Sequence, residues 1–143
     1  MSDENGPKGG IGPKGGIVVT FGTFDLIHIG HIKLLKRAKA LGQRLVVGVS
    51  TDDFTYKKKN RKALYSQEER KEILESLSFV DEVFFEESFE QKRQYLLEHK
   101  ADIFVMGDDW KDRFNEFEDI CKVVYLERTP SISTTALIET IRQ

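Results

Sequence analysis

The stretch TFGTFDLIHIGHIKLL, residues 20–35, joins two kinds of sequence pattern. It continues the β-branched and aromatic run of residues 17–21 and then passes into a segment whose apolar residues recur every three or four positions. A strand that leads into a helix is the first part of a β–α–β unit. His28 and His31 lie at this junction with Gly30 between them. We therefore expect both imidazoles near the start of the first helix, beyond the carboxyl end of the first strand.

Strand-like and helix-like segments alternate along the rest of the chain. Short β-rich runs occupy residues 17–21, 44–50, 81–85, 102–106 and 122–126. Helical spacing between them involves Ile32, Leu35, Ala38 and Leu41, then Ile73, Leu74 and Leu77, then Tyr95, Leu96 and Leu97, with weaker helical segments at 114–120 and from about 134 to the end. Capping boxes, Ser66 with Glu69 and Ser88 with Gln91, predict where the second and third helices begin. The alternation predicts an α/β fold, a doubly wound five-stranded parallel sheet in a single domain at residues 17–143.

The composition fits one domain and excludes several classes of protein. The length of 143 residues suits a single ordinary domain. The formal net charge of -2 gives no basic field, so we expect no nucleic-acid partner. Cys121 is the only cysteine, which excludes a disulfide framework and indicates a reducing, cytoplasmic location. No apolar run is long enough to cross a bilayer, so no membrane insertion is expected.

Residues 1–16, MSDENGPKGGIGPKGG, are rich in glycine and lysine. A phosphate-binding glycine loop follows a strand and opens a helix, whereas this segment precedes the first strand. We therefore interpret it as a flexible tail.

Polar segments follow four of the five predicted strands. They are GTFDLIHIGH (22–31), TDDFTYKKKNRKALY (51–65), GDDWKDRF (107–114) and RTPSISTT (128–135), all of which we expect to be loops or helix starts. In an open parallel sheet, ligands bind beyond the carboxyl ends of the strands, where the strand order reverses. These segments are therefore the candidate binding region.

The pair His28 and His31 is suited to binding phosphates. Unpaired N–H groups and the helix dipole favour an anion at a helix start, and Gly30 permits close approach. Phosphate charge would in turn favour protonated imidazoles. A solvated helix cap is the plainer alternative. A histidine metal site would need a third ligand, and His99 is poorly placed for this, so we expect no metal bound by side chains of this kind.

Two further segments support binding of a polyphosphate. Arg128 precedes the hydroxyl-rich run Ser133, Thr134 and Thr135, which is typical of a second anion-binding helix start. KKKNRK, residues 57–62, holds five cations and alone would be a solvated loop. Beside two anion sites it predicts a mobile phosphate clamp.

The segments GTFDLIHIGH, FVMGDDW and RTPSISTT, with ALYSQEERKEILESL and VDEV between them, closely resemble the glycerol-3-phosphate cytidylyltransferases of the HxGH nucleotidyltransferase superfamily. The resemblance covers essentially residues 17–143. It implies attack by glycerol 3-phosphate on the α-phosphorus of CTP, giving CDP-glycerol and pyrophosphate without a covalent enzyme intermediate. It also implies strand order 3-2-1-4-5, a homodimer with VDEV near the subunit contact, and Mg²⁺ that accompanies CTP and is held mainly by phosphates and water.

The resemblance also assigns residues position by position. The implied catalytic residues are His28, His31, Lys59 and Arg128. The implied nucleotide contacts are Thr23, Phe24, His28, Gly30, His31, Arg61, Asp109, Arg128, Thr129, Ile132, Ser133, Thr134 and Thr135. Lys59, Lys92 and Asp25 are assigned to the acceptor, with a structural cap the equal alternative for Asp25. A one-residue length difference in the 53–60 loop leaves Lys58, Lys59, Arg61 and Lys62 indistinguishable.

The sequence departs from the family pattern at a few positions. Pro130 and Ser131 stand where Glu-Gly is usual, Ser78 where arginine is common, and Phe89 where tryptophan is common. None of these positions involves the histidines, so nucleotidyl transfer is predicted more firmly than the acceptor. The alternatives are the same transfer with phosphoethanolamine, phosphocholine or ATP, and a catalytically silent nucleotide-binding module.

Overall fold

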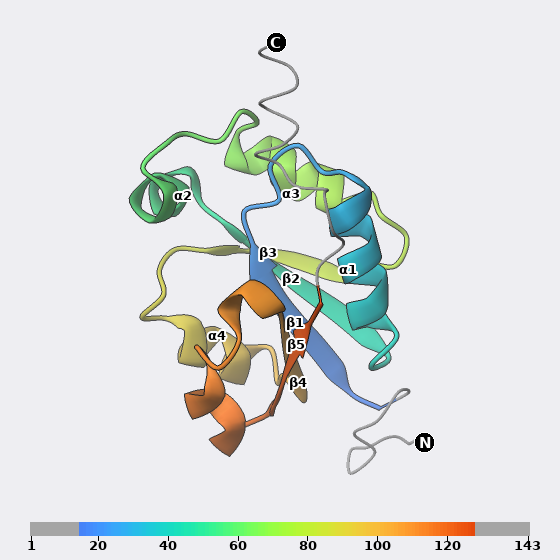
Figure 1. Ribbon diagram of the computed structural model, residues 1–143. Coiled ribbons are helices and arrows are strands. Elements are labelled where there is room, and N and C mark those ends of the chain that lie inside the picture. Colours follow the sequence, from blue (N-terminus) through green and yellow to red (C-terminus); the bar gives the residue numbers. More distant parts are fainter. Residues whose placement is uncertain (1–14, 128–143) are drawn as a thin grey trace.

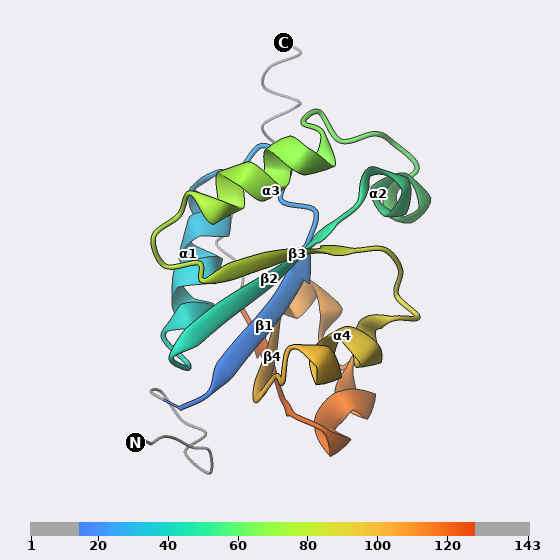
Figure 2. The ribbon, with the colours of Figure 1, turned by 180° about the vertical axis from the view of Figure 1, so that it is seen from behind.

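The computed structural model describes residues 15–127 (Figures 1 and 2). Along the chain, the elements are β1 (Ile17–Gly22), α1 (Ile29–Lys39), β2 (Arg44–Ser50), α2 (Asp52–Lys59), α3 (Gln67–Glu75), β3 (Glu82–Glu86), α4 (Lys92–Glu98), β4 (Ile103–Gly107), the 3₁₀ turns η1 (Asp108–Trp110) and η2 (Asn115–Asp119), and β5 (Lys122–Leu126). All strand pairs are parallel, in the order β3-β2-β1-β4-β5. This confirms the predicted fold and strand order.

Helices cover both faces of the sheet (Figures 1 and 2). Successive residues of a strand point to opposite faces, so Val18 packs with Leu35 of α1 and Leu74 of α3, whereas Val19 packs with Leu96 of α4. The central strands are apolar on both faces, as expected of a parallel sheet that is buried on both sides. The strands β2 and β3 lie on one side of β1, and β4 and β5 lie on its other side. The strand order therefore reverses between β1 and β4, and this is the switch point of the sheet.

The predicted helix starts are confirmed in part. At α3, Ser66 Oγ accepts from the backbone N–H of Glu69, and the Glu69 carboxylate accepts from that of Ser66, forming the predicted capping box. At Ser88 only half of the predicted box forms: Ser88 Oγ accepts from the Gln91 N–H at 3.3 Å, while the Ser88 hydroxyl, not its N–H, donates to Gln91 Oε1 at 2.9 Å. The predicted start of this helix is wrong, because α4 begins only at Lys92.

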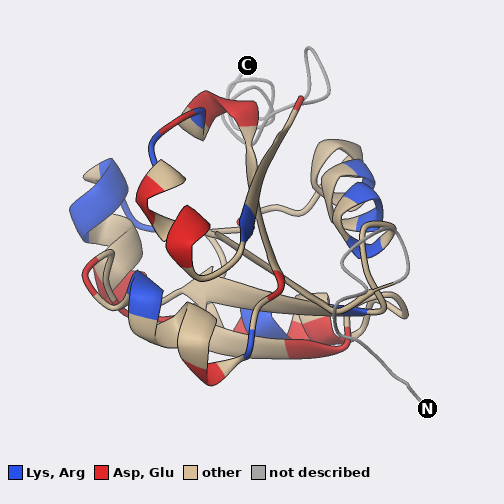
Figure 3. Ribbon diagram, turned by 90° about the horizontal axis from the view of Figure 1, so that it is seen from below, with Lys and Arg blue, Asp and Glu red and all other residues tan. Residues whose placement is uncertain are grey.

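The polar segment after β2 is not the loop that we expected, because it contains α2. Thr51 Oγ1 accepts from the Phe54 N–H at 3.1 Å and caps the start of this helix, and Asn60 ends it with a φ of 56°. Acidic residues occupy its first turn and lysines its last, as the helix dipole favours. Lys57, Lys58 and Lys59 of the predicted clamp are therefore held on a helix, whereas Arg61 and Lys62 follow it. Basic residues occupy the last turns of α1 and α2 (Figure 3).

Gly16, just before the predicted start of the domain, packs against the described part of the chain. The carbonyl of Gly16 accepts from the Gln43 N–H at 2.9 Å, and a Cβ at Gly16, where φ is 85°, would overlap the Asp102 carboxylate. Residues 1–14 and 128–143, which include most of the predicted tail and the predicted last helix, lie outside the described residues. Within residues 15–127, no helix is both long and apolar enough to cross a membrane.

Candidate active site

The two histidines cap the first helix with their own side chains. His28 is the N-cap of α1, and its Nδ1 accepts from the Gly30 N–H at 3.0 Å. His31 Nδ1 accepts from the His28 N–H at 3.2 Å, which completes a reciprocal capping box. Because both Nδ1 atoms are acceptors, each neutral ring carries its proton on Nε2. The pair is therefore both a helix cap and a pair of oriented Nε2–H donors.

The surroundings of His31 favour its neutral form. Burial, followed by the charge of His28, whose ring centroid is 4.0 Å away, lowers its pKa from 6.5 to about 4. The sequence analysis expected protonated imidazoles on the basis of bound phosphate charge, whereas the protein's own residues act in the opposite direction. Protonation at Nδ1 would also remove the bond from the His28 N–H.

The loop between β1 and α1 is tightly held. Phe24 and Leu26 both have positive φ, 54° and 51°, which costs free energy in residues other than glycine. Asp25 is buried, and its two carboxylate oxygens accept from the N–H groups of Leu64 and Tyr65 at 2.7 and 3.1 Å. The sequence analysis weighed an acceptor contact and a structural cap for Asp25, and these two hydrogen bonds are those of a structural cap.

Arg70 of α3 fastens this loop to the sheet, and the sequence analysis did not select it. Its side chain is fully buried, and one guanidinium nitrogen donates to the carbonyls of Thr23 and Ser50 at 2.9 and 2.8 Å. The same side chain also donates to the Tyr65 carbonyl and to the Asp52 carboxylate. Arg70 therefore links the carboxyl ends of β1 and β2.

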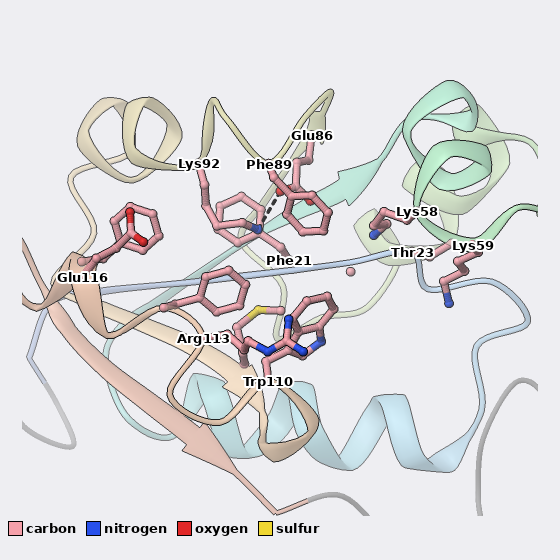
Figure 4. Close-up of a pocket in the computed structure, with 14 residues that line it drawn as sticks. Phe21, Thr23, Lys58, Lys59, Glu86, Phe89, Lys92, Trp110, Arg113 and Glu116 are labelled. Atoms are coloured by element: carbon pink, nitrogen blue, oxygen red, sulfur yellow. Dashed lines mark hydrogen bonds and ion pairs between the residues drawn. The ribbon is translucent and has the colours of Figure 1, made fainter.

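A pocket of about 630 Å³ opens beyond the carboxyl ends of β1 and β4, on the α4 side of the sheet (Figure 4). Its lining residues are Phe21, Gly22, Thr23, Lys58, Lys59, Glu86, Phe89, Lys92, Met106, Trp110, Arg113, Phe114, Glu116 and Phe117. Three of the candidate residues, Thr23, Lys59 and Lys92, thus meet in one cavity. The histidines do not line it, because α1 packs on the other face.

The pocket also separates the cations that sequence alone left indistinguishable. Lys58 and Lys59 line it, whereas Arg61 and Lys62 do not. Lys58 Nζ donates to Ser50 Oγ at 2.7 Å and lies 4.7 Å from the centroid of the Phe54 ring. Burial lowers the pKa of Lys58 to about 8 and also lowers the pKa of Lys59, which leaves Lys58 largely protonated at pH 7. Both can offer positive charge to a phosphate.

Lys92 is buried at the opposite wall, only 2% exposed. Its ammonium donates to Glu86 Oε2 at 2.7 Å and lies 3.9 Å from the centroid of the Phe21 ring (Figure 4). Phe114 and Phe89 lie at 5.1 and 5.5 Å. Burial disfavours both charges, lowering the pKa of Lys92 and raising that of Glu86, while their mutual attraction opposes both shifts. Sequence reasoning found Lys92 but missed Glu86.

The remaining candidates divide into two groups. Asp109 is exposed in η1, directly after β4, and does not line the pocket. The segment from Arg128 to Thr135, including Thr129, Ile132, Ser133 and Thr134, lies outside the described residues. Within residues 15–127, no group of three or more His, Cys, Asp or Glu side chains could hold a metal ion.

Comparison with known proteins gives consistent matches. The glycerol-3-phosphate cytidylyltransferase of Bacillus subtilis is 56% identical over 124 residues, covering 87% of this chain and 95% of the relative. The enzyme of that name from Staphylococcus aureus is 46% identical over 120 residues, covering 84% and 90%. The crystal structure of the lipopolysaccharide core biosynthesis protein from Thermoplasma volcanium matches with a TM-score of 0.70 and 28% identity, covering 79% of this chain and 97% of that one.

The family comparison covers nearly the whole chain. The family model described as cytidylyltransferase-like matches residues 19–140, a range that contains the histidine pair, α2, the pocket residues and the segment that begins at Arg128. This chain therefore belongs to the cytidylyltransferase-like family.

Proposed function

We propose that this protein transfers CMP from CTP to glycerol 3-phosphate, forming CDP-glycerol and pyrophosphate. The observation that carries the proposal is its 56% and 46% identity to two glycerol-3-phosphate cytidylyltransferases over most of both chains. The lysine-lined pocket at the switch point of the sheet supports it, because it offers positive charge where an α/β fold binds ligands.

The reaction needs positioning and charge neutralisation more than proton transfer. A phosphate oxygen of the acceptor attacks the α-phosphorus of CTP, and the bond from that phosphorus to the oxygen bridging to the β-phosphate breaks, releasing pyrophosphate. The attacking oxygen is already anionic at neutral pH, so no general base is required. The protein's contribution is therefore to align the two substrates and to stabilise the charge on the transferring group.

The structure suggests how the roles divide. His28 and His31 would donate their Nε2–H groups to the phosphates of CTP, and Arg128 with residues 129–135 would hold the nucleotide, as the family resemblance implies. Lys58 and Lys59 would bind the acceptor phosphate, and Lys92, paired with Glu86, would add positive charge to the same pocket.

The aromatic rings of the pocket favour an acceptor without a cationic group over one that carries an ammonium. Aromatic faces are the usual recognition surface for quaternary ammonium groups. Here Lys92 fills that position, 3.9 Å from the Phe21 ring centroid and 5.1 Å from that of Phe114. A choline or ethanolamine ammonium would meet a positive charge of the protein itself. Glycerol 3-phosphate carries no such group.

Mg²⁺ would accompany CTP, bound mainly by phosphate oxygens and water, and would supply positive charge to the triphosphate. Asp109, exposed at the carboxyl end of β4, is the carboxylate that fits a supporting contact. Asp25 fits less well, because both of its oxygens accept backbone N–H groups.

We also propose a homodimer in the cytoplasm, with no nucleic-acid partner. The dimer is supported by the position of β3, which forms one edge of the sheet next to the VDEV segment, residues 80–83. Light scattering at micromolar concentration should give about twice 16.5 kDa, and a mass near 16.5 kDa would contradict the dimer.

Pyrophosphate release from a matrix of CTP, ATP, UTP and GTP against several phosphorylated alcohols tests the proposed reaction. We expect release with CTP and glycerol 3-phosphate, with kcat/KM at least about 100-fold above phosphocholine or phosphoethanolamine. Preference for either of those acceptors, or for ATP, would contradict the proposal. No release with any pair would make the protein a nucleotide-binding module.

A further inference from the structure

A buried carboxylate stands in the wall of a pocket otherwise suited to anions. Glu86 is the last residue of β3, is 1% exposed, and lines the same cavity as Lys58 and Lys92. A carboxylate repels a phosphate at short range, and its burial is costly unless its oxygens are satisfied. The acceptor phosphate alone therefore does not account for Glu86.

Lys92 satisfies one of the two carboxylate oxygens. Its Nζ lies 2.7 Å from Oε2, and both side chains are nearly fully buried. No residue within 15–127 donates a hydrogen bond to Oε1, yet this atom is not among the sealed, unsatisfied polar atoms of that part of the chain. Oε1 is therefore not fully sealed, although Glu86 as a whole is only 1% exposed, and it is the acceptor that Glu86 offers to the pocket it lines.

The pair is fixed in place by its surroundings. The Lys92 ammonium lies on the Phe21 ring at 3.9 Å, with Phe114 and Phe89 nearby, so it cannot easily turn toward a ligand and abandon Glu86. Lys58 and Lys59 lie on another side of the cavity, near Thr23 (Figure 4). The cavity thus has a phosphate-binding side and a side with a hydrogen-bond acceptor.

We propose that Glu86 determines acceptor specificity: it accepts a hydrogen bond from a hydroxyl group of a phosphorylated polyol and repels acceptors that carry a carboxylate in addition to the phosphate. This inference rests on the proposed function. The terminal hydroxyl group of glycerol 3-phosphate can donate to Oε1, whereas 3-phosphoglycerate carries a carboxylate on that carbon, which has no proton to donate at neutral pH and is repelled. Glu86 thereby distinguishes a phosphorylated alcohol from a phosphorylated acid of nearly the same size.

The test uses the full chain with CTP and measures two quantities by pyrophosphate release: the KM for glycerol 3-phosphate and the inhibition constant Ki of 3-phosphoglycerate. In the unmodified protein, we expect Ki to exceed KM by at least about 10-fold, the minimum from one charged hydrogen bond. In Glu86→Gln, which keeps the shape and removes the charge, this ratio should fall by about 10-fold. Glu75→Gln, at the end of α3 and paired with Lys71 on the surface, is the matched control and should leave the ratio unchanged.

Parallel changes of KM and Ki in Glu86→Gln would overturn the proposal, because Glu86 would then act only by holding Lys92. A Ki near KM in the unmodified protein would also overturn it. If Glu86→Gln does not fold, the double variant Glu86→Gln/Lys92→Gln removes both buried charges together and should also lose the discrimination. Absence of turnover with glycerol 3-phosphate in the unmodified protein would instead contradict the proposed function.

Discussion

Replacing His31 can separate two roles that one imidazole holds. Its Nδ1 accepts from the His28 N–H at 3.2 Å and caps α1, while its Nε2–H is the group available to donate to a phosphate. Alanine removes both groups. Asparagine keeps an acceptor close to the position of Nδ1 but reaches no further, so it restores the cap without the donor.

The two losses have different sizes and appear in different measurements. Loss of a side-chain cap costs about 1 kcal/mol, which lowers Tm by about 4 °C in a chain of this length. Loss of one preorganised donor to a transition-state oxyanion reduces kcat by about 10²–10³-fold. A group that acts mainly in the transition state adds little to ground-state binding, so the KM for CTP should change by less than about 3-fold.

We therefore expect His31→Ala to lose both Tm and kcat, and His31→Asn to recover Tm but not kcat. Thermal unfolding by circular dichroism gives Tm, and pyrophosphate release at saturating substrates gives kcat. Lys33→Ala, at an exposed position of the same helix, is the control and should change neither. Recovery of kcat in His31→Asn would show that the imidazole acts by shaping the loop. An unchanged kcat with weaker CTP binding in His31→Ala would make it a ground-state anchor and refute the mechanism.

Four further perturbations test other parts of the structure. The pKa of His31 is about 4 in the folded protein and 6.5 when exposed, so the unfolded chain takes up the proton first; Tm should fall as pH drops from about 6.5 to 4, and less so in His31→Asn. Arg70→Met should lower the free energy of unfolding in urea by at least about 3 kcal/mol, since several buried carbonyls lose their donor; a loss below about 1 kcal/mol would contradict this. Lys59→Ala and Lys92→Ala should each raise the KM for glycerol 3-phosphate about 10-fold or more and the KM for CTP by less. A larger rise in the KM for CTP would show that these lysines bind the nucleotide instead. Deleting residues 1–14 should leave kcat/KM nearly unchanged, because every described candidate residue lies beyond Gly22; a large fall in a folded truncation would show that this segment takes part.

The pattern of apolar residues along the sequence predicted the strands of the sheet well but did not predict the helix α2. The strands are buried on both faces, so their sequences are runs of apolar residues that single-chain patterns detect readily. In α2 only Phe54 and Thr55 are buried, and the helix is set by the Thr51 cap and by charges placed along its dipole. Such a helix has almost no periodic apolar signal.

The sequence analysis also missed the buried charged residues Arg70 and Glu86, because charged residues are usually exposed. Arg70 did have a signal, because it lies three and four residues before Ile73 and Leu74, on the apolar face of α3. For Glu86 the only signal in the sequence was its position at the carboxyl end of a strand. For the histidines, the sequence analysis named a helix cap as an alternative but did not predict the reciprocal capping box, because capping signatures are built on Ser, Thr, Asp and Asn.

The proposed reaction also explains why the histidines and the lysine pocket lie on opposite faces of the sheet. Phe24, beside His31, packs with the α1 core, whereas Phe21, beneath Lys92, packs with the α4 core. Displacement at phosphorus places the attacking and leaving oxygens roughly in line, on opposite sides of the transferring group. An acceptor in the pocket and a pyrophosphate at the start of α1 would meet that requirement if the α-phosphate lay over the carboxyl end of β1, at Gly22 and Thr23. Arg70 donates to the Thr23 carbonyl at this point, so in the proposed arrangement its rigidity would help to align both substrates.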